Sequence, residues 1–366
     1  MNARNVCRKF LALLFVAILS GTASAQEAAW KQLASSAKQE GRIVLSGPAD
    51  PALRKGLPEK FTERFGIVVE YIGAPTNEAI ARLRKERHAG LYTTDLMLVG
   101  PTALLSVYSE KMLDPLRPLL FNEILDGRNW KGGKARFSDP EGQYSLRIAE
   151  RVTALFMINK NQVKREELRS IHDLTNPRWK GKIVAEDPTR SAAGTGLPMV
   201  LYTSLGEEFI KKLYLDNQVV LSGDRRQMAD WLARGTYPIS MGVREEDFQR
   251  LRSDGFPVEI VNSLPDFPGY VAVGAGHLVA LNRAPHPSAA RLFANWLASK
   301  EGLQTYCRLM GEPTMRIDVD ESKVPQYMIP KPGVAYIDSA SWEYGLKRQA
   351  VSQRLKELLS ASKPAQ

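Results

Sequence analysis

Strand-like and helix-like segments alternate three times between Arg42 and Ser109, and this alternation constrains the fold more than any other feature. Each short run rich in β-branched residues is followed by apolar residues at helical spacing. Three such pairs in succession predict a parallel sheet covered by helices, and therefore an α/β fold class. The strand-like runs are RIVLS at 42–46, IVVEYI at 67–72 and TDLMLV at 94–99.

A second α/β block starts near Lys182, and two long β-rich runs connect it to the first. These runs, 148–159 and 270–281, are longer than the other predicted strands, as segments that cross between two lobes would be. We therefore expect two lobes, each a mostly parallel sheet flanked by helices, joined by two crossing strands. Lobe 1 is expected to take residues 26–147 and 272–320, and lobe 2 residues 148–271 and 321–366.

Several helices have residues at their predicted starts that can cap free backbone N–H groups. A side-chain oxygen at such a position satisfies a donor that the helix itself leaves unpaired. The predicted caps are Asp50 before Pro51, Thr76 or Asn77, Ser204 in a capping box with Glu207, and Asp224 in a capping box with Gln227.

The first 25 residues have the composition of a cleavable export signal. Its parts are the basic residues Arg4, Arg8 and Lys9, the apolar residues 11–20 and the small residues 23–25. The apolar part is too short to span a membrane. We therefore expect a periplasmic protein whose mature chain starts near Gln26.

Removal of this segment would lower the formal net charge from +10 to +7 and leave Cys307 as the only cysteine. An intramolecular disulfide is then impossible, so stability must come from core burial. The basic residues recur singly rather than in runs with aromatic residues, which speaks against a nucleic-acid partner. We expect a monomer that binds a small anionic solute.

The stretch 182–196, KIVAEDPTRSAAGTG, has the pattern of a strand, a polar loop and a helix start. Free N–H groups at a helix N-terminus favour an anion, and glycines let the anion approach the backbone closely. The alternative is an ordinary connection between strand and helix, in which the glycines only make the turn.

Ligands of doubly wound sheets bind at the carboxyl ends of the strands, and small or polar residues follow several predicted strands here. The candidate ligand-binding residues in lobe 1 are Ser46, Gly47, Thr76, Asn77, Gly100 and Thr102. Those in lobe 2 are Arg151, Asp187, Thr189, Arg190, Ser191, Gly194, Thr195 and Arg244. Arg244 favours an anion because a guanidinium pairs bidentately with carboxylate or phosphate. In the alternative interpretation Thr76, Asn77 and Thr102 are plain helix caps, and Arg151 pairs with Glu150 or Asp187.

The sequence offers no arrangement typical of metal or covalent chemistry. The four histidines, His88, His172, His277 and His286, lack metal-ligand spacing with one another or with Cys307. The glycines of AVGAGHL lack the spacing of a dinucleotide fingerprint, and no G-x-S-x-G motif occurs. We expect no enzyme activity, no metal and no cofactor. His277 is placed near the ligand site, with core packing or a local hydrogen bond as its expected role.

Four segments in this order resemble the periplasmic solute-binding proteins of ABC importers, in the branch that includes ferric-ion-binding proteins. They are HDLTNPRWKGKI at 172–183, AEDPTRSAAGTG at 185–196, QMADWLARGTYPISMGV at 227–243 and APHPSAARLFANWLASKEG at 284–302. The resemblance implies a type II binding-protein fold, whose two lobes close like a hinge on a solute held between them. It also implies an inner-membrane ABC permease as the partner that receives the solute.

The chain departs from the ferric-binding members after the strand that ends at Val243. Those proteins have a tyrosine pair there, because phenolate oxygens suit a trivalent cation. This chain has Arg244-Glu245-Glu246-Asp247 instead, and no Tyr-Tyr pair anywhere. The resemblance therefore indicates a small anionic or polar solute, such as a phosphonate, sugar phosphate, carboxylate or chelated metal. Ferric ion bound through Tyr144 or Tyr270, an exported enzyme on the same fold and a ligand-presenting partner of a sensor stay as alternatives.

Overall fold

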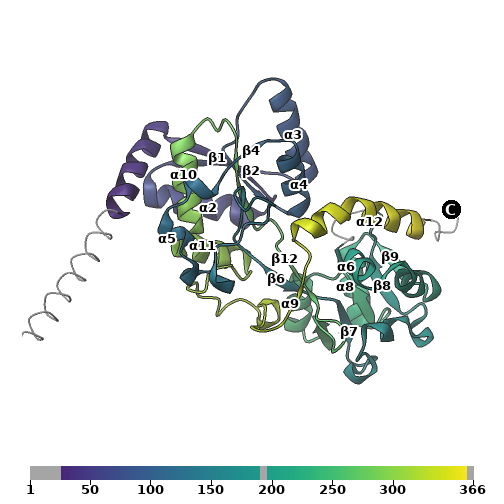
Figure 1. Cartoon of the computed structure of the whole chain (residues 1–366). Coiled ribbons are helices and arrows are strands. Elements are labelled where there is room, and N and C mark those ends of the chain that lie inside the picture. The colour runs from purple at the N-terminus through teal and green to yellow at the C-terminus, as the bar shows by residue number, and fades with distance from the viewer. Residues whose placement is uncertain (1–25, 190–195, 361–366) are drawn as a thin grey trace, which may run out of the picture. The chain divides into compact units, whose positions relative to one another are not determined.

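The chain divides into two units, each of which is an α/β structure, as the alternation predicted. The computed structural model describes residues 26–189 and 196–360 (Figure 1). Unit 1 is Met1–Ile148 with Ala275–Asp320, and unit 2 is Ala149–Gly274 with Glu321–Gln366. The expected export signal at 1–25 and the loop residues 190–195 lie outside the described part. Within that part, every helix is too short or too polar to cross a membrane.

Unit 1 is built on a mixed sheet in the order β2-β1-β3-β13-β4, with β5 also paired to β13. Its first three strands are parallel, and β13 is antiparallel to its neighbours. The strands are β1 (Arg42–Gly47), β2 (Val68–Gly73), β3 (Leu96–Val99), β4 (Leu113–Asp114), β5 (Ser145–Arg147) and β13 (His277–Leu281). Its α-helices include α2 (Pro51–Phe65), α3 (Thr76–His88), α4 (Pro101–Ser109), α5 (Asn122–Leu125), α10 (Pro287–Ala298) and α11 (Lys300–Met310), and residues 26–40 are also helical.

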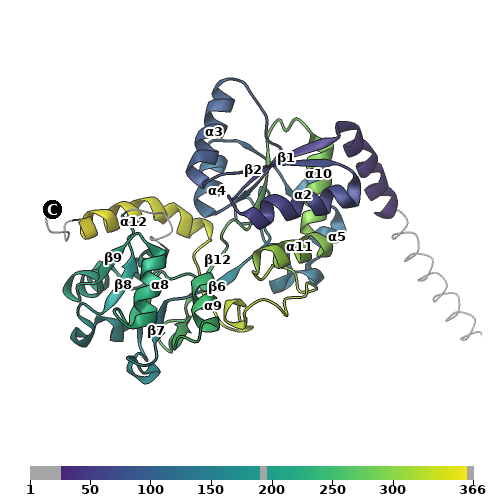
Figure 2. The same cartoon turned by 180° about the vertical axis from the view of Figure 1, so that it is seen from behind.

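The core of unit 1 contains an aromatic group contributed by α2 and α10. The ring of Phe61 lies 4.9 Å from that of Phe293 and 5.3 Å from that of Trp296, measured between centroids. Helices α2, α10 and α11 pack against one another, and α3 packs against α4 (Figures 1 and 2). All four residues of β3 are buried, as expected for a strand covered on both faces.

Unit 2 has a five-stranded sheet in the order β11-β7-β10-β8-β9 and a smaller sheet in the order β14-β12-β6. In the larger sheet β8, β9 and β10 are parallel, whereas β7 is antiparallel to both of its neighbours. The strands are β6 (Arg151–Thr153), β7 (Phe156–Asn159), β8 (Ile183–Glu186), β9 (Val220–Ser222), β10 (Ile239–Met241), β11 (Val258–Val261), β12 (Tyr270–Ala272) and β14 (Ile337–Asp338). The helices are α6 (Gly196–Leu205), α7 (Glu207–Ile210), the π-helix η7 (Lys211–Asp216), α8 (Arg225–Arg234), α9 (Glu245–Ser253) and α12 (Trp342–Ser360).

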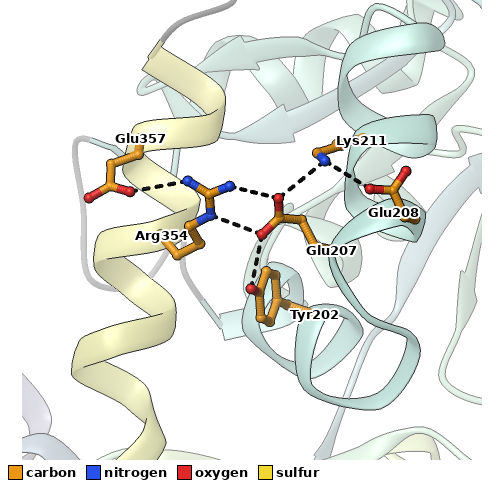
Figure 3. Close-up of polar contacts among 6 residues, drawn as sticks. All are labelled: Tyr202, Glu207, Glu208, Lys211, Arg354 and Glu357. Atoms are coloured by element: carbon orange, nitrogen blue, oxygen red, sulfur yellow. Dashed lines mark hydrogen bonds and ion pairs between the residues drawn. The ribbon is translucent and has the colours of Figure 1, made fainter.

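The final helix, α12, belongs to unit 2 although it is far in sequence from most of that unit. It packs on α6 and η7 and places Leu355 and Leu359, both almost fully buried, in the unit's hydrophobic core. On the outer side Arg354 donates two hydrogen bonds to Glu207, at 2.9 and 2.7 Å, and a third to Glu357 (Figure 3). Apolar burial and this ion pair therefore both hold the helix in place.

Each crossing run contains two short strands, which corrects the prediction of a single long strand. The first run is divided into β6 and β7, and the second into β12 and β13. Strands β6 and β12 pair with each other inside unit 2, and the units divide at Ile148/Ala149 and Gly274/Ala275. The sequence pattern hides these breaks because β7 and β13 are fully buried, so apolar residues continue through both runs.

Two of the predicted helix caps are confirmed. The Asp50 carboxylate accepts a hydrogen bond from the N–H of Leu53 at 2.9 Å, at the start of α2. The Asp224 carboxylate accepts one from the N–H of Gln227 at 3.1 Å, at the start of α8. Both side chains satisfy donors that the helix leaves unpaired.

The other predicted caps are wrong. Helix α3 begins at Thr76 itself, with Pro75 before it and no side-chain cap, so neither Thr76 nor Asn77 caps it. Ser204 lies inside α6. The next helix starts after Gly206, whose positive φ of 84° is incompatible with a continuous helix. Thr102 lies within α4, which follows Gly100.

Candidate functional site

In unit 1 the three parallel strands end at one edge of the sheet. The register pairs Ser46 with Ile72 and with Met97, so the loops after β1, β2 and β3 leave from the same edge. This edge carries all of the residues predicted for lobe 1, namely Ser46, Gly47, Thr76, Asn77, Gly100 and Thr102. The topology therefore brings the six residues to the place where parallel sheets bind ligands.

These six residues differ in their surroundings. Ser46 is fully buried, and its hydroxyl has no hydrogen-bond partner among the described residues. Thr76, Asn77 and Thr102 are exposed. A Cβ on Gly47 would lie 2.3 Å from the hydroxyl of Tyr71, so close packing already explains this glycine.

In unit 2 the parallel strands β8, β9 and β10 also end at one edge. Asp187 follows β8, and its carboxylate accepts hydrogen bonds from the N–H and the hydroxyl of Thr189, at 2.8 and 2.6 Å. Arg244 follows β10, is exposed and makes no side-chain cap to α9. Four further candidates, Arg190, Ser191, Gly194 and Thr195, lie in the loop outside the described residues.

A group of buried and half-buried polar side chains in unit 2 lies around Tyr270 on β12. Tyr270 lies opposite Thr153 in the β6–β12 ladder, and Ala272 lies opposite Arg151. Residues directly opposite in an antiparallel pair face the same side, so Arg151 and Thr153 share the face of Tyr270. The Tyr270 hydroxyl is 4.0 Å from where a Cβ on Gly196, the first residue of α6, would lie.

Three charged side chains lie close enough to act on the Tyr270 hydroxyl. Burial is the largest cause that raises the pKa of Tyr270; Glu245 raises it further, whereas Arg151 and Arg348 lower it. The side chain is 5% exposed, and the phenol stays protonated at neutral pH. Tyr270 is therefore a neutral hydrogen-bond donor that two guanidinium groups and a carboxylate influence electrostatically.

Three buried polar atoms in this group have no hydrogen-bond partner among the described residues: Thr153 Oγ1, Tyr214 Oη and Glu245 Oε1. Tyr214 is 4% exposed, and its pKa is raised by burial first and by Tyr270 second. A buried polar atom without a partner costs about 1–3 kcal/mol. Several such atoms in one place are typical of a site that a bound molecule or ordered water completes.

Of these residues, sequence reasoning found Arg151 as a candidate and considered Tyr270 only as an iron ligand. It missed Thr153, Tyr214 and Arg348, and it noted Glu245 only as one of the residues that replace the tyrosine pair of the ferric-binding members. The residues come from separate segments, β6, η7, α9, β12 and α12, so no local motif joins them. The only sequence signal was the placement of Arg151 and Tyr270 on the two crossing runs.

His277 and Ser138 form a serine–histidine pair in unit 1 that is structural. The His277 Nε2 lies 2.9 Å from the Ser138 hydroxyl, which also accepts a hydrogen bond from Arg147 Nε at 3.2 Å. Both residues are buried, and burial lowers the pKa of His277 to about 3. The expected role of His277, core packing with a local hydrogen bond, is confirmed.

The described residues contain no group of three or more His, Cys, Asp or Glu side chains that could hold a metal ion. Tyr144 is in unit 1, where its ring packs edge-on against Tyr108 at 5.4 Å between centroids. Tyr270 is the tyrosine that lies among charged groups.

Comparison with known proteins agrees with this fold. The family model described as bacterial extracellular solute-binding protein matches residues 57–328. An uncharacterised protein of Haemophilus influenzae is 25% identical over 289 residues, which cover 75% of this chain and 78% of that protein.

Two solved structures share the two-lobe fold of periplasmic binding proteins. The apo ferric ion-binding protein A of Pasteurella haemolytica has a TM-score of 0.67 at 15% identity, over 89% of this chain and 100% of that chain. The periplasmic binding protein AfuA of Actinobacillus pleuropneumoniae, with bound fructose-6-phosphate, has a TM-score of 0.57 at 18% identity, over 88% and 97%. With a family match over most of its length and the two-lobe α/β fold, the chain belongs to the bacterial extracellular solute-binding proteins.

Proposed function

We propose that this protein is the periplasmic binding component of an ABC importer and that it captures a small anionic solute. The observation that carries the anionic preference is the group around Tyr270, where Arg151 and a neutral phenol donor share one face of a small sheet. A guanidinium and a phenol hydroxyl both donate hydrogen bonds, which suits a carboxylate or phosphate oxygen.

The remaining predicted residues contribute at the edges of the two sheets. In this proposal Ser46 offers its unpartnered hydroxyl from unit 1, and the loop with Arg190 and Thr195 adds donors in unit 2. The protein binds its solute without covalent chemistry. The two units then close around the solute, and the permease recognises the closed state.

Thermal-shift measurements with a panel of anionic metabolites test the proposal, because a ligand that binds only the folded state raises the melting temperature. Arg151→Ala should weaken binding of any stabilising anion by about 1.5–3 kcal/mol, the range for charge-assisted hydrogen bonds. Arg234→Ala is the matched control, since Arg234 is an exposed arginine of the same unit whose guanidinium pairs with Asp230 on α8. A folded protein that no anion stabilises would contradict the proposal.

Ferric ion is the second candidate solute, and the buried Tyr270 is the observation in its favour. Two guanidinium groups beside that phenol oppose a bare trivalent cation, so an iron chelate with an anionic carrier fits the charges better. A ferric phenolate absorbs visible light. A colourless protein after addition of ferric citrate would exclude coordination by Tyr270.

A further inference from the structure

The C-terminal helix α12 reaches the group around Tyr270 through two residues one turn apart. Tyr344 and Arg348 have the i,i+4 spacing that places side chains on one side of a helix. Tyr344 is 8% exposed and lies in the same buried core cluster as Tyr270, and both Tyr344 and Arg348 act electrostatically on Tyr270. Burial lowers the pKa of Arg348, so its guanidinium is also held away from bulk water.

The position of Arg348 is fixed by the packing of its helix. Leu355 and Leu359 anchor α12 in the core of unit 2, and the Arg354–Glu207 ion pair fixes its outer side (Figure 3). Arg348 is therefore carried by a helix that is anchored in the core of unit 2. Together with Arg151 it brings a second guanidinium to the same phenol.

Glu245 supplies a carboxylate to this group. It is the first residue of α9, where the helix dipole favours a negative charge. Its Oε1 is buried without a hydrogen-bond partner in the part of the chain that the structure describes. The group thus contains a hydrogen-bond acceptor, the Glu245 carboxylate, together with several donors. A simple anion has no donor to offer, so it would leave this carboxylate oxygen without a hydrogen bond.

We propose that α12 completes the solute site: Arg348 joins Arg151 in binding the acid group of the solute, and Glu245 accepts a hydrogen bond from a donor next to that group. The solute is then a hydroxylated acid, either a hydroxycarboxylate or a hydroxylated phosphate monoester. This inference rests on the proposed function and assigns two specificity-determining residues to it.

Two pairs of probes separate the acid group from the neighbouring donor. Lactate and propionate differ by one hydroxyl, and glycerol 3-phosphate and propyl phosphate differ by two. Titration calorimetry on the full mature chain should show tighter binding of the hydroxylated member of at least one pair, by about tenfold or more.

The variants then assign the two roles. Glu245→Met should abolish the preference for the hydroxylated member, and Glu245→Gln, which keeps a carbonyl acceptor, should restore part of it. Arg348→Met should weaken both members of the pair alike, by about tenfold or more. Lys356→Met is the matched control, because Lys356 is an exposed cation on the same helix.

The outcomes distinguish this inference from the proposed function. Wild-type protein that binds none of the four probes contradicts the proposed anion-binding function itself. Wild-type protein that binds both members of each pair equally overturns the role of Glu245. Arg348→Met protein that binds as tightly as Lys356→Met protein overturns the role of α12, provided that both variants show the circular dichroism spectrum of the wild type.

Discussion

At the scale of single residues, Asp95 is a buried side chain that connects three segments of unit 1. It is fully buried just before β3, and its carboxylate accepts hydrogen bonds from the N–H of Val44 at 2.7 Å and from the N–H of His286 at 2.8 Å. It also lies 2.9 Å from the Nδ1 of the His286 ring. One carboxylate therefore ties β3 to β1 and to the start of α10.

Asp95→Ala should lower the free energy of unfolding by about 3–5 kcal/mol, because it leaves these buried donors without an acceptor. Urea denaturation at neutral pH measures the loss. Asp114→Ala, at an exposed aspartate of strand β4 in the same sheet, is the control and should change stability by less than about 0.5 kcal/mol. Similar losses in the two variants would show that the hydrogen bonds of Asp95 contribute little.

Residues that contact their close neighbours in sequence could be predicted, whereas residues that contact distant segments of the chain could not. Asp50 and Asp224 satisfy N–H groups three residues away, so the local pattern revealed both. Arg151 could be found because it starts a crossing run. The proposed roles of Glu245 and Arg348 could not be predicted, because they depend on Tyr270, which is distant from both in sequence. Locally, each is only a charged residue of a helix.

At the scale of elements, α12 is a structural part of unit 2, because Leu355 is fully buried in its core. Leu355→Ala should lower the free energy of unfolding by about 2–5 kcal/mol, the usual cost of a truncated core leucine. Leu346→Ala on the same helix should cost little, because Leu346 is 58% exposed. Urea denaturation compares the two, and equal effects would mean that α12 does not depend on burial.

The ion pair between Arg354 and Glu207 should make the docking of α12 sensitive to acid. The hydrogen bond from Arg354 is the main cause that lowers the pKa of Glu207 from its ordinary 4.5 to about 2 (Figure 3). A carboxyl whose pKa is lower in the folded state stabilises the fold above its ordinary pKa, and this contribution is lost as the pH falls from 4.5 to about 2.

The difference in melting temperature between wild type and Glu207→Gln isolates this contribution from other titrating groups. The wild type should melt at the higher temperature near neutral pH, and the difference should shrink as the pH falls through that window. A difference that stays constant down to pH 2 would mean that the lowered pKa of Glu207 does not stabilise the fold.

The elements themselves could largely be predicted, because periodicity and β-branched residues mark them locally. The alternation between Arg42 and Ser109 predicted three strands and three helices in the right order. The crossing runs show the limit of such reasoning. Residues Ala154 and Leu155 separate two strands that pair in different sheets, and only the pairing reveals the break.

At the scale of the whole molecule, the chain passes between its units at two places, Ile148/Ala149 and Gly274/Ala275. A solute can shift a population of open and closed molecules only by the difference in its affinity for the two states. If Ser46 of unit 1 binds the solute together with Arg151 and Arg348 of unit 2, only the closed state makes all of these contacts. The difference in affinity between the two states then comes from the contacts that the open state lacks.

Saturation with a tightly bound solute should therefore reduce the radius of gyration measured by small-angle X-ray scattering. Arg348→Met protein, brought to the same saturation with more solute, should show a smaller reduction, since it lacks one of the contacts that favour the closed state. A solute that binds tightly and leaves the radius of gyration unchanged would mean that unit 2 holds it alone. The unpartnered hydroxyl of Ser46 would then need an explanation within unit 1.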